Sequence, residues 1–357
     1  MPRLLILCEY PTLLGGERSL LATLAAVRAA GFEVSFAAPP TGPLAEAVRR
    51  AEVSLVPWTK RDELPEIVER VRPDLVHANS LSTARISGPV VAAARLPSIG
   101  HLRDIVKLSQ QAVDDVNRHR QLVAVSEATR DFHARQGVDA AKCTVIYNGV
   151  DLAAFRPRAG TGYLHAELGL PPGLPLVATI GQLGLRKGTE VALAAAEHVP
   201  GVHWLVVGER TSEKEESREF ERQLHAMAAR PALAGRVHFL GARGDVAELL
   251  SEFTLLVHAA RQEPLGRVLL EAAACGLPVV ATDVGGTREI FATEDDGARL
   301  VQADDPLEIA AAVRELLDDV PRRRVLGAAG RTRAETAFDV RRAARQLIDL
   351  YHRVLKL

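Results

Sequence analysis

The sequence lacks several features that would assign it to particular classes of protein. It has only three cysteines and no CxxC pair, which argues against a disulfide framework and a thiolate metal site. Its formal net charge is −1, without the basic excess typical of nucleic-acid binders. No apolar run approaches the ~18 residues of a membrane-spanning helix, and the start lacks the pattern of a signal peptide. We therefore expect a cytoplasmic protein without nucleic-acid partners, with peripheral contact at the inner face of the membrane left open.

The 357 residues do contain short apolar runs that alternate with helical patterns from end to end. This order predicts parallel sheets covered by helices on both faces. The Pro- and Gly-rich segment 155–175 is the best candidate for a domain boundary. The predicted fold class is therefore α/β, with two doubly wound parallel-sheet domains at 1–160 and 161–339. The expected strands are 3–8, 34–39, 74–80, 98–103, 122–126 and 144–148, then 175–181, 203–209, 237–241, 255–260, 278–283 and 298–302.

Ligands of such sheets bind beyond the carboxyl ends of the strands, so the residues that follow strands deserve most weight. Gly15 and Gly16 stand between the first strand and a helical pattern. They allow a close approach to an anion at the helix N-terminus, or simply a tight turn. The dinucleotide fingerprint GxGxxG is absent here and at the other junctions, which argues against a nicotinamide enzyme.

Two further junctions carry charged or titratable side chains. His101, with Arg103 and Asp104, ends a strand, where an imidazole can position a substrate or move a proton; a structural histidine is the simpler alternative. Arg186 and Lys187 follow the glycine-rich loop after strand 175–181 and precede a helical pattern. Cations are unfavourable at that end of a helix, so the pair predicts a bound anion, unless water screens both charges.

The stretch EPLGRVLLEAAACGLPVVATDVGG at 263–286 brackets the start of an expected helix with two carboxylates. Pro264 suits a first turn, which would leave the N–H groups of Leu265, Gly266 and Arg267 free. Glu263 and Glu271 would then be roughly 12 Å apart along the helix, too far for the ~5 Å pair of a retaining glycosidase. Acids that accept from hydroxyls at both ends of a central anion match a nucleotide diphosphate sugar. The simpler alternatives are that Glu263 interacts favourably with the helix dipole and that Glu271 is exposed to solvent.

Taken together, these segments resemble the retaining GT-B glycosyltransferases of family 4. The resemblance covers most of the chain and includes the Gly-Gly loop, VSEATRDF…VIYNGVD (125–151), GQLGLRKG (181–188) and the 263–286 stretch. It implies two Rossmann-like domains that face a central cleft, with the last helix, 340–357, returning to the first domain. It also implies transfer of a hexosyl group from a UDP- or GDP-linked sugar to an acceptor hydroxyl, in polysaccharide, glycolipid or glycoside biosynthesis.

The resemblance also implies roles for single residues. Glu263 would bind hydroxyls of the donor sugar and Glu271 the ribose. Arg186 and Lys187, after Gly181, would hold the diphosphate, with backbone contacts around Leu265, Gly266 and Arg267. Gly15 and Gly16 would line the cleft near the diphosphate, and His101 would lie near the transferred sugar. His101, Arg186, Lys187 and Glu263 are thus the expected catalytic residues, with no metal and no cofactor beyond the donor. The acceptor would be a sugar, a lipid-linked molecule or another small molecule.

The chain departs from the family pattern at three places. Gln182 replaces an arginine, the GGxE loop is shortened to Gly-Gly-Glu with Glu17, and Ala259-Ala260 replaces Pro-Ser. All the expected carboxylates and Lys187 remain. Two alternatives stay open: another GT-B enzyme, such as a sugar-nucleotide epimerase or a phosphorylase, and a non-catalytic nucleotide-sugar binder.

Overall fold

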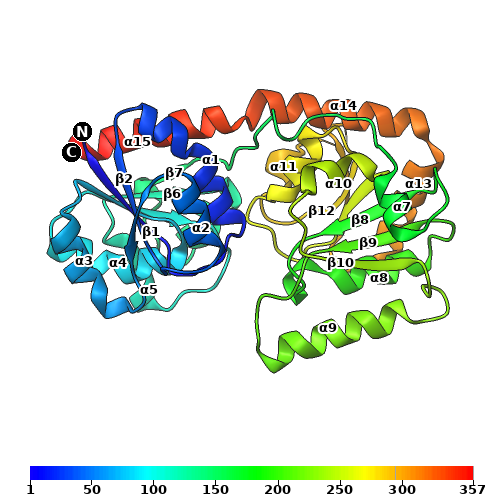
Figure 1. Ribbon diagram of the computed structural model, residues 1–357, viewed down its shortest axis with the longest axis horizontal. Helices are drawn as coiled ribbons and strands as arrows, with labels where there is room; N and C mark the ends of the chain where they lie inside the picture. The colour runs from blue at the N-terminus through cyan, green and yellow to red at the C-terminus, as the bar shows by residue number, and fades with distance from the viewer. Residues whose placement is uncertain (294, 357) are drawn as a thin grey trace. The chain divides into compact units, whose positions relative to one another are not determined.

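The computed structural model describes residues 1–293 and 295–356, and these form two compact units (Figure 1). Unit 1 contains Met1–Gly149 and Phe338–Leu357, and unit 2 contains Val150–Ala337. Residues 150–160 therefore belong to the second unit, before the boundary expected at 160/161. The segment lacks regular structure and packs on unit 2, as in the contact of Pro157 with Gly276.

Unit 1 is built on a parallel seven-stranded sheet of order β3-β2-β1-β4-β5-β6-β7. Its strands are β1 (Arg3–Leu7), β2 (Glu33–Ala38), β3 (Ser54–Pro57), β4 (Leu75–Ala78), β5 (Ser98–Leu102), β6 (Gln121–Ala124) and β7 (Cys143–Val145). Its helices are α1 (Gly15–Ala29), α2 (Pro43–Arg50), α3 (Leu64–Val71), α4 (Leu81–Ala93), α5 (Gln110–Asn117), α6 (Glu127–Ala134) and α15 (Val340–Lys356), with short 3-10 turns η1 (Arg61–Glu63) and η2 (Ala140–Lys142).

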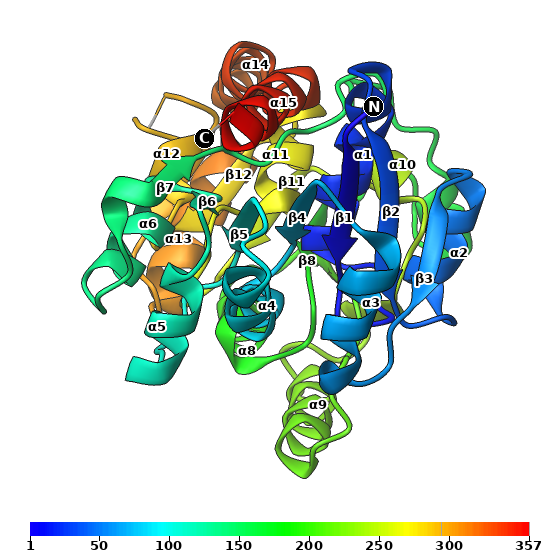
Figure 2. The same cartoon turned by 90° about the vertical axis from the view of Figure 1, so that its left-hand side faces the viewer.

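Both faces of this sheet are covered, and β1 shows how the sequence achieves this. Leu4 and Ile6 pack with α1, α2 and α15, whereas Leu5 and Leu7 pack with α3 and α4 on the other side. Successive side chains of a strand point to opposite faces, so a continuous apolar run is what a doubly covered strand requires. Figure 2 shows the helices on the two sides of this sheet.

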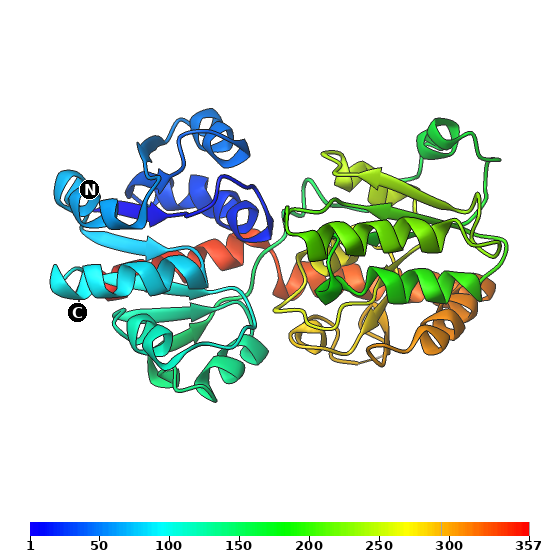
Figure 3. The ribbon, with the colours of Figure 1, turned by 90° about the horizontal axis from the view of Figure 1, so that it is seen from below.

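Unit 2 has a parallel six-stranded sheet of order β10-β9-β8-β11-β12-β13. Its strands are β8 (Leu176–Ile180), β9 (His203–Val207), β10 (Val237–Gly241), β11 (Leu255–His258), β12 (Val279–Thr282) and β13 (Ala298–Val301). Its helices are α7 (Tyr163–Leu168), α8 (Thr189–Glu197), α9 (Glu215–Ala228), α10 (Val246–Glu252), α11 (Arg267–Ala274), α12 (Thr287–Ile290), α13 (Pro306–Asp318) and α14 (Val320–Ala337), with the 3-10 turn η3 (Leu185–Lys187). Figure 3 shows the green helices α8 and α9 side by side.

The prediction of two doubly wound parallel sheets is confirmed, and each expected strand is present within a few residues of its predicted bounds. The structure adds one strand, β3, which the sequence did not reveal. It is an edge strand of four residues, SLVP, and it is only partly buried. Such a strand has neither the length nor the apolar pattern of its neighbours. Within the described residues, no helix is both long enough and apolar enough to cross a bilayer.

Close packing of α4 against α5 gives a test of the fold. A Cβ at Gly88 in α4 would lie 1.9 Å from the carbonyl oxygen of Asp115. Replacing glycine by alanine inside a helix normally stabilises a protein by roughly 0.5–1 kcal/mol. Gly88→Ala is instead expected to lower the melting temperature by several degrees, because the two helices must separate.

The matched control is Gly244→Ala, where a Cβ meets no atom within 4 Å and φ is not positive. Calorimetric scans of the full chain compare the variants. Equal melting temperatures for both would show that α4 and α5 are not packed as closely as described.

Candidate functional site

The loop after β11 carries Glu263, Leu265 and Gly266, three of the residues predicted to bind the donor, and β12 holds this loop in place. Thr282, the last residue of β12, donates a hydrogen bond to the carbonyl of Ala260 at 2.5 Å. The Gly286 N–H donates to the carbonyl of Glu263 at 2.9 Å. A Cβ at Gly285 would lie 2.0 Å from that same carbonyl oxygen, so only glycine fits there. The stretch TDVGG, residues 282–286, thus fixes the position of the backbone that carries Glu263.

Glu263 is a buried carboxylate with two partners on one oxygen. Its side chain is 7% exposed, and its Oε2 accepts from Lys187 Nζ at 2.5 Å and from His258 Nε2 at 2.9 Å. Burial alone would raise the pKa of this carboxyl, but the charge of Lys187 and the His258 hydrogen bond together hold it well below its usual value. Glu263 is therefore ionised at neutral pH.

His258, the last residue of β11, was missed by the sequence analysis. Burial lowers the pKa of its imidazole, so it is neutral, and it must carry its proton on Nε2 to donate to the Glu263 carboxylate. The sequence feature that could have indicated its role is a histidine at the end of an otherwise apolar strand, five residues before a glutamate. The sequence suggested no partner, because an aliphatic side chain is the ordinary occupant of such a position.

The two predicted cations lie in η3, before α8, and they differ in their surroundings. Lys187 is neutralised by Glu263, so for this residue the expected anion is a side chain of the protein itself. Arg186 is exposed, and its Nη1 donates to the carbonyl of Gln262 at 3.3 Å. Gly188 adopts a φ of +61°, and a Cβ there would lie 2.0 Å from the carbonyl oxygen of Ala259. This contact brings η3 against the β11 loop.

The helix in the 263–286 stretch begins later than predicted, and this is a correction. α11 starts at Arg267, and Gly266 before it has a φ of +100°. Pro264 and Leu265 therefore lie in the loop and do not form a first turn, so the helical spacing of roughly 12 Å between the two glutamates does not apply. The free N–H groups of the helix start at Arg267. The cause is the left-handed glycine, which interrupts the helical backbone that the proline could have begun.

Glu271 lies on α11 and pairs with Arg267 one turn earlier. Arg267 Nε donates to Glu271 Oε1 at 2.6 Å, and both side chains are largely buried. Arg267 Nη1 is buried and has no hydrogen-bond partner among the described residues. A buried guanidinium N–H without a partner is costly, so this group is suited to receive an anionic ligand. From the sequence, only the backbone N–H of Arg267 was expected to contact a ligand.

Unit 1 holds the remaining predicted residues. Gly15 and Gly16 are the first two residues of α1, and a Cβ at Gly16 would lie 3.0 Å from the Arg103 side chain. Arg103 is fixed by Asn79 and by the side chain of Asn148, the latter at 2.9 Å. Burial lowers its pKa to about 10, so Arg103 remains charged at neutral pH. From the sequence, Arg103 was distinguished only as a neighbour of His101, and its contacts with Asn79 and Asn148 have no local signature.

The shortened Gly-Gly-Glu loop has a local structural role. The Glu17 carboxylate accepts from the N–H of Leu14 at 3.0 Å and so caps the start of α1. Gln182, which replaces the family's arginine, donates through Nε2 to the hydroxyl of Thr211. These two side chains are therefore occupied within the protein.

The predicted residues thus fall into three groups. Gly181, Lys187, Glu263 and Gly266 lie together, because a Cβ at Gly181 would lie 3.7 Å from Lys187 Cδ and one at Gly266 would lie 3.3 Å from Glu263 Cγ. Arg186 is next to Lys187 in the chain, and Leu265, which is buried, is next to Gly266. Arg267 and Glu271 form a second group on α11. Gly15, Gly16 and His101 belong to unit 1.

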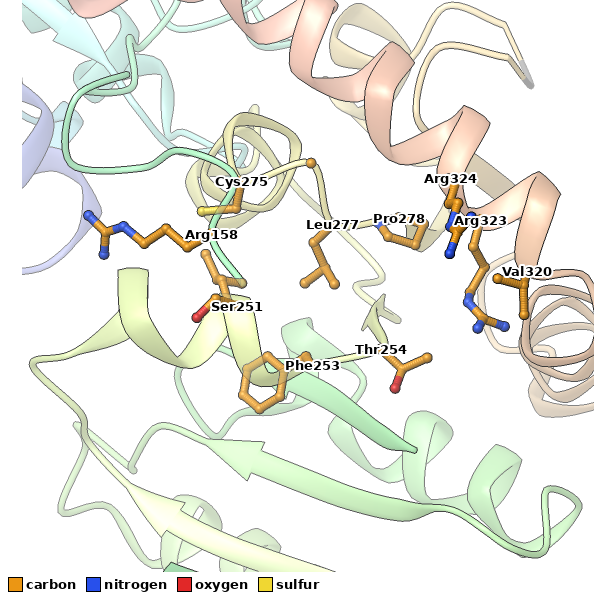
Figure 4. Close-up of a pocket in the computed structure, with 12 residues that line it drawn as sticks. Arg158, Ser251, Phe253, Thr254, Cys275, Leu277, Pro278, Val320, Arg323 and Arg324 are labelled. Atoms are coloured by element: carbon orange, nitrogen blue, oxygen red, sulfur yellow. The ribbon is translucent and has the colours of Figure 1, made fainter. Parts of the chain in front are cut away.

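A pocket of about 360 Å³ in unit 2 contains none of the predicted residues (Figure 4). Thr254 and Pro278 line it, just before β11 and β12, so it opens at the amino ends of these strands. Two of its three arginines have partners already: Arg158 pairs with Glu248 at 3.2 Å, and Arg323 donates to the carbonyl oxygen of Leu316 in α13 at 2.5 Å. We therefore place the site at the other end of the strands.

Solved structures with the same fold include HepE from Anabaena in complex with UDP and glucose. It has a TM-score of 0.90 and 23% identity, and the match covers 99% of this chain and 100% of HepE. Sucrose-phosphate synthase from Thermosynechococcus elongatus has a TM-score of 0.79 and 23% identity, covering all of both chains. The two Rossmann-like units with parallel sheets thus define a protein of the GT-B class.

Two family descriptions match the chain. "Glycosyltransferase Family 4" matches residues 14–154, and "Glycosyl transferases group 1" matches residues 163–333. The chain belongs to the family 4 glycosyltransferases, as the sequence motifs predicted.

The curated relatives carry different names. A D-inositol 3-phosphate glycosyltransferase of Xylanimonas cellulosilytica is 33% identical over 250 residues, which are 66% of this chain and 59% of that protein. An alpha-maltose-1-phosphate synthase of Mycobacterium tuberculosis is 33% identical over 245 residues, 65% of this chain and 63% of that protein. The chain therefore spans about three fifths of the length of these relatives.

The Lys187–Glu263 pair leads to a prediction on stability. Removing one partner of a buried ion pair typically costs 3–5 kcal/mol, because the other charge is left uncompensated. We expect Lys187→Met to lower the free energy of unfolding by about 3 kcal/mol at pH 7, and the added change Glu263→Gln to recover part of the loss.

The dependence on pH follows from the lowered pKa of Glu263. A carboxyl whose pKa falls on folding contributes stability above its unfolded pKa, ~4.3, and loses it as the pH falls toward the folded value. In Lys187→Met this contribution of Glu263 is smaller. The difference in free energy of unfolding between wild type and the variant should therefore decrease below pH 4. Urea unfolding across pH 3–8 measures it; a gap that is constant with pH would contradict the pairing.

Proposed function

We propose that the protein transfers a hexosyl group from a UDP- or GDP-linked sugar to an acceptor hydroxyl, with retention of the anomeric configuration. The observation that carries this proposal is the state of Glu263. The carboxylate is buried and ionised, and its Oε2 is occupied by Lys187 and His258. No described residue hydrogen-bonds to Oε1, and this atom is not sealed from solvent. An oriented acceptor of this kind suits the hydroxyl groups of a sugar.

Cationic and backbone donors around this carboxylate suit the diphosphate. Arg186 is exposed beside Glu263, Arg267 has an N–H without a partner, and the free N–H groups of α11 begin at the same residue. Together they offer charge-assisted hydrogen bonds to an anion. Glu271, with one oxygen committed to Arg267, suits the ribose hydroxyls through the other. The names of HepE's complexes with UDP and with UDP-glucose support a donor of this class.

In the proposed reaction the bond from the sugar C1 to the β-phosphate oxygen breaks, and a bond from C1 to the acceptor oxygen forms on the same face. The acceptor proton passes to the departing phosphate. Arg186, Lys187 and Arg267 stabilise the negative charge that develops on the diphosphate, the electrostatic effect that tends to dominate such reactions. Glu263 stays ionised throughout, because its low pKa disfavours a role as acid. We propose that these cations replace a metal, so activity should persist in a chelator.

The acceptor needs a separate proposal, because the relatives are named for different molecules. Their names give D-inositol 3-phosphate for one, maltose 1-phosphate as the product of another, and lipopolysaccharide core biosynthesis for a third. We propose that unit 1 binds the acceptor, which would bring the protein to the inner face of the membrane only if the acceptor is lipid-linked.

A panel of nucleotides and nucleotide sugars tests the donor class by thermal shift. A ligand at a hundred times its dissociation constant adds about 2.7 kcal/mol to the stability of the state that binds it. We expect UDP or GDP derivatives to raise the melting temperature of wild type, and to do so less for Arg186→Ala. An unchanged melting temperature with every nucleotide would overturn the proposal.

Turnover separates the enzyme from its alternatives. We expect Glu263→Gln to lower kcat/KM by roughly ten- to a hundredfold, because a charged hydrogen-bond acceptor contributes about 1.5–3 kcal/mol. The control is Glu216→Gln, at an exposed position on α9. Release of nucleoside diphosphate only with an acceptor indicates a transferase, epimerisation of the donor indicates an epimerase, and binding without any turnover indicates a binding protein. NMR of the new glycosidic bond reports retention or inversion.

A further inference from the structure

Three side chains of unit 1 form a buried chain of hydrogen bonds that the proposed reaction does not yet use. Tyr351 Oη lies 2.6 Å from His77 Nδ1, and His77 Nε2 lies 3.2 Å from His101 Nδ1. The residues come from α15, β4 and β5, and all three are at most 4% exposed. The chain ends at His101 Nε2, which is buried and has no hydrogen-bond partner among the described residues.

Both histidines are neutral. Burial, the nearby charge of Arg103 and the proximity of each histidine to others lower their pKa values, that of His77 to about 3. A neutral imidazole carries one hydrogen, so each ring has one nitrogen that donates and one that accepts. Once the position of one hydrogen is known, the donor and the acceptor of every hydrogen bond from Tyr351 to His101 therefore follow.

Tyr351 supplies that hydrogen. Its hydroxyl is fully buried, and His77 is its only hydrogen-bond partner among the residues that the structure describes. Burial raises the pKa of the phenol, so the hydroxyl keeps its hydrogen. If the hydroxyl accepted from His77, its own hydrogen would be buried without a partner, which is unfavourable. Tyr351 therefore donates to His77 Nδ1.

The remaining hydrogens are then determined. His77 must carry its hydrogen on Nε2 and donate it to His101 Nδ1. His101 must in turn carry its hydrogen on Nε2. The unpartnered atom at the end of the chain is thus an N–H, and a buried N–H requires an acceptor.

We propose that Tyr351, acting through His77, holds His101 as the neutral Nε2–H tautomer, so that His101 donates a hydrogen bond to a hydroxyl oxygen of the sugar substrate and does not serve as a general base. The identity of this oxygen rests on the proposed function; the direction of the hydrogen bonds does not. His101 contacts the ligand, whereas His77 and Tyr351 are positioning residues. A sugar hydroxyl fits because its oxygen offers lone pairs without a charge.

The tautomers are measured directly by nitrogen-15 NMR of the full chain labelled at histidine, because the two neutral forms give different ring-nitrogen patterns. His119 and His133 are internal references: each places Nε2 on a backbone carbonyl oxygen, at 2.9 Å and 2.7 Å, and must donate there. His101→Gln and His77→Gln assign the two signals. We expect both rings in the Nε2–H form from pH 6 to 8. His101 as the Nδ1–H form, or charged, would overturn the proposal.

Tyr351→Phe tests the origin of this preference. Without the hydroxyl, His77 can donate to His101 or accept from it, and the same number of hydrogen bonds forms in either case. We therefore expect the His101 signals to move toward a mixture of tautomers. The signals of His119 and His133 should stay in place. An unchanged His101 in a folded Tyr351→Phe protein would remove Tyr351 from the proposal. If this variant does not fold, His77→Gln is the second test. The amide of glutamine can donate to His101 Nδ1 in the same way as His77 does, so His101 should keep its hydrogen on Nε2.

Kinetics separate a donor from a base. Glutamine places an N–H near the position of Nε2 but takes up no proton at neutral pH, so His101→Gln should lose less of the transfer rate than His101→Leu, which should lose roughly tenfold or more. Equal losses in both, together with a wild-type pH profile that falls with the titration of a histidine, would indicate a general base and overturn the proposal. Because the NMR result needs no turnover, it holds even if the proposed transferase reaction fails.

Discussion

The ion pair of Glu263 with Lys187 is the interaction on which the candidate site depends. A carboxylate that is 7% exposed stays ionised only when its charge is met at close range. Lys187 meets it from η3, and His258 adds a neutral donor from the end of β11. Both use the same oxygen, so the other has no hydrogen-bond partner among the described residues. The protein thus presents a fixed acceptor without leaving a bare negative charge beside the diphosphate that we propose it binds.

Glycines make this arrangement possible by letting backbones approach. Gly188 and Gly285 each leave room for a carbonyl oxygen where a Cβ would lie 2.0 Å from it. The first contact brings Lys187 to the β11 loop, and the second fixes the carbonyl of Glu263 itself. The geometry around the carboxylate is therefore set by main-chain packing, which is more rigid than a contact between long side chains. A side chain at either position would displace the loop before it altered any charge.

The sequence predicted the parts that depend on periodicity and on local order. The alternation of apolar runs gave twelve of the strands, and the family motifs placed Glu263, Lys187 and Glu271 in unit 2. It failed where the decisive contact is distant in the chain. Lys187 and Glu263 are separated by 76 residues, so their pairing, and with it the neutralisation of Lys187, has no local signature. The later start of α11 was missed because Pro264 favours a helix, whereas the positive φ of Gly266 is decided by the packing of the loop.

The last helix shows how far such distant contacts extend. The Leu347, Leu350, Tyr351 and Val354 side chains of α15 share a core with Leu4 and Ile6 of β1, so the two ends of the chain complete unit 1 together. Unit 2 is a continuous segment, Val150–Ala337, and contains none of the residues of α15. During synthesis, unit 2 can therefore close before unit 1 obtains its last helix. Because that helix also carries Tyr351, the imidazole of His101 acquires its proposed orientation of hydrogens only once α15 has packed on unit 1. On our proposal, the step that finishes the hydrophobic core also prepares a polar group for its ligand, which would couple the stability of unit 1 to function through α15.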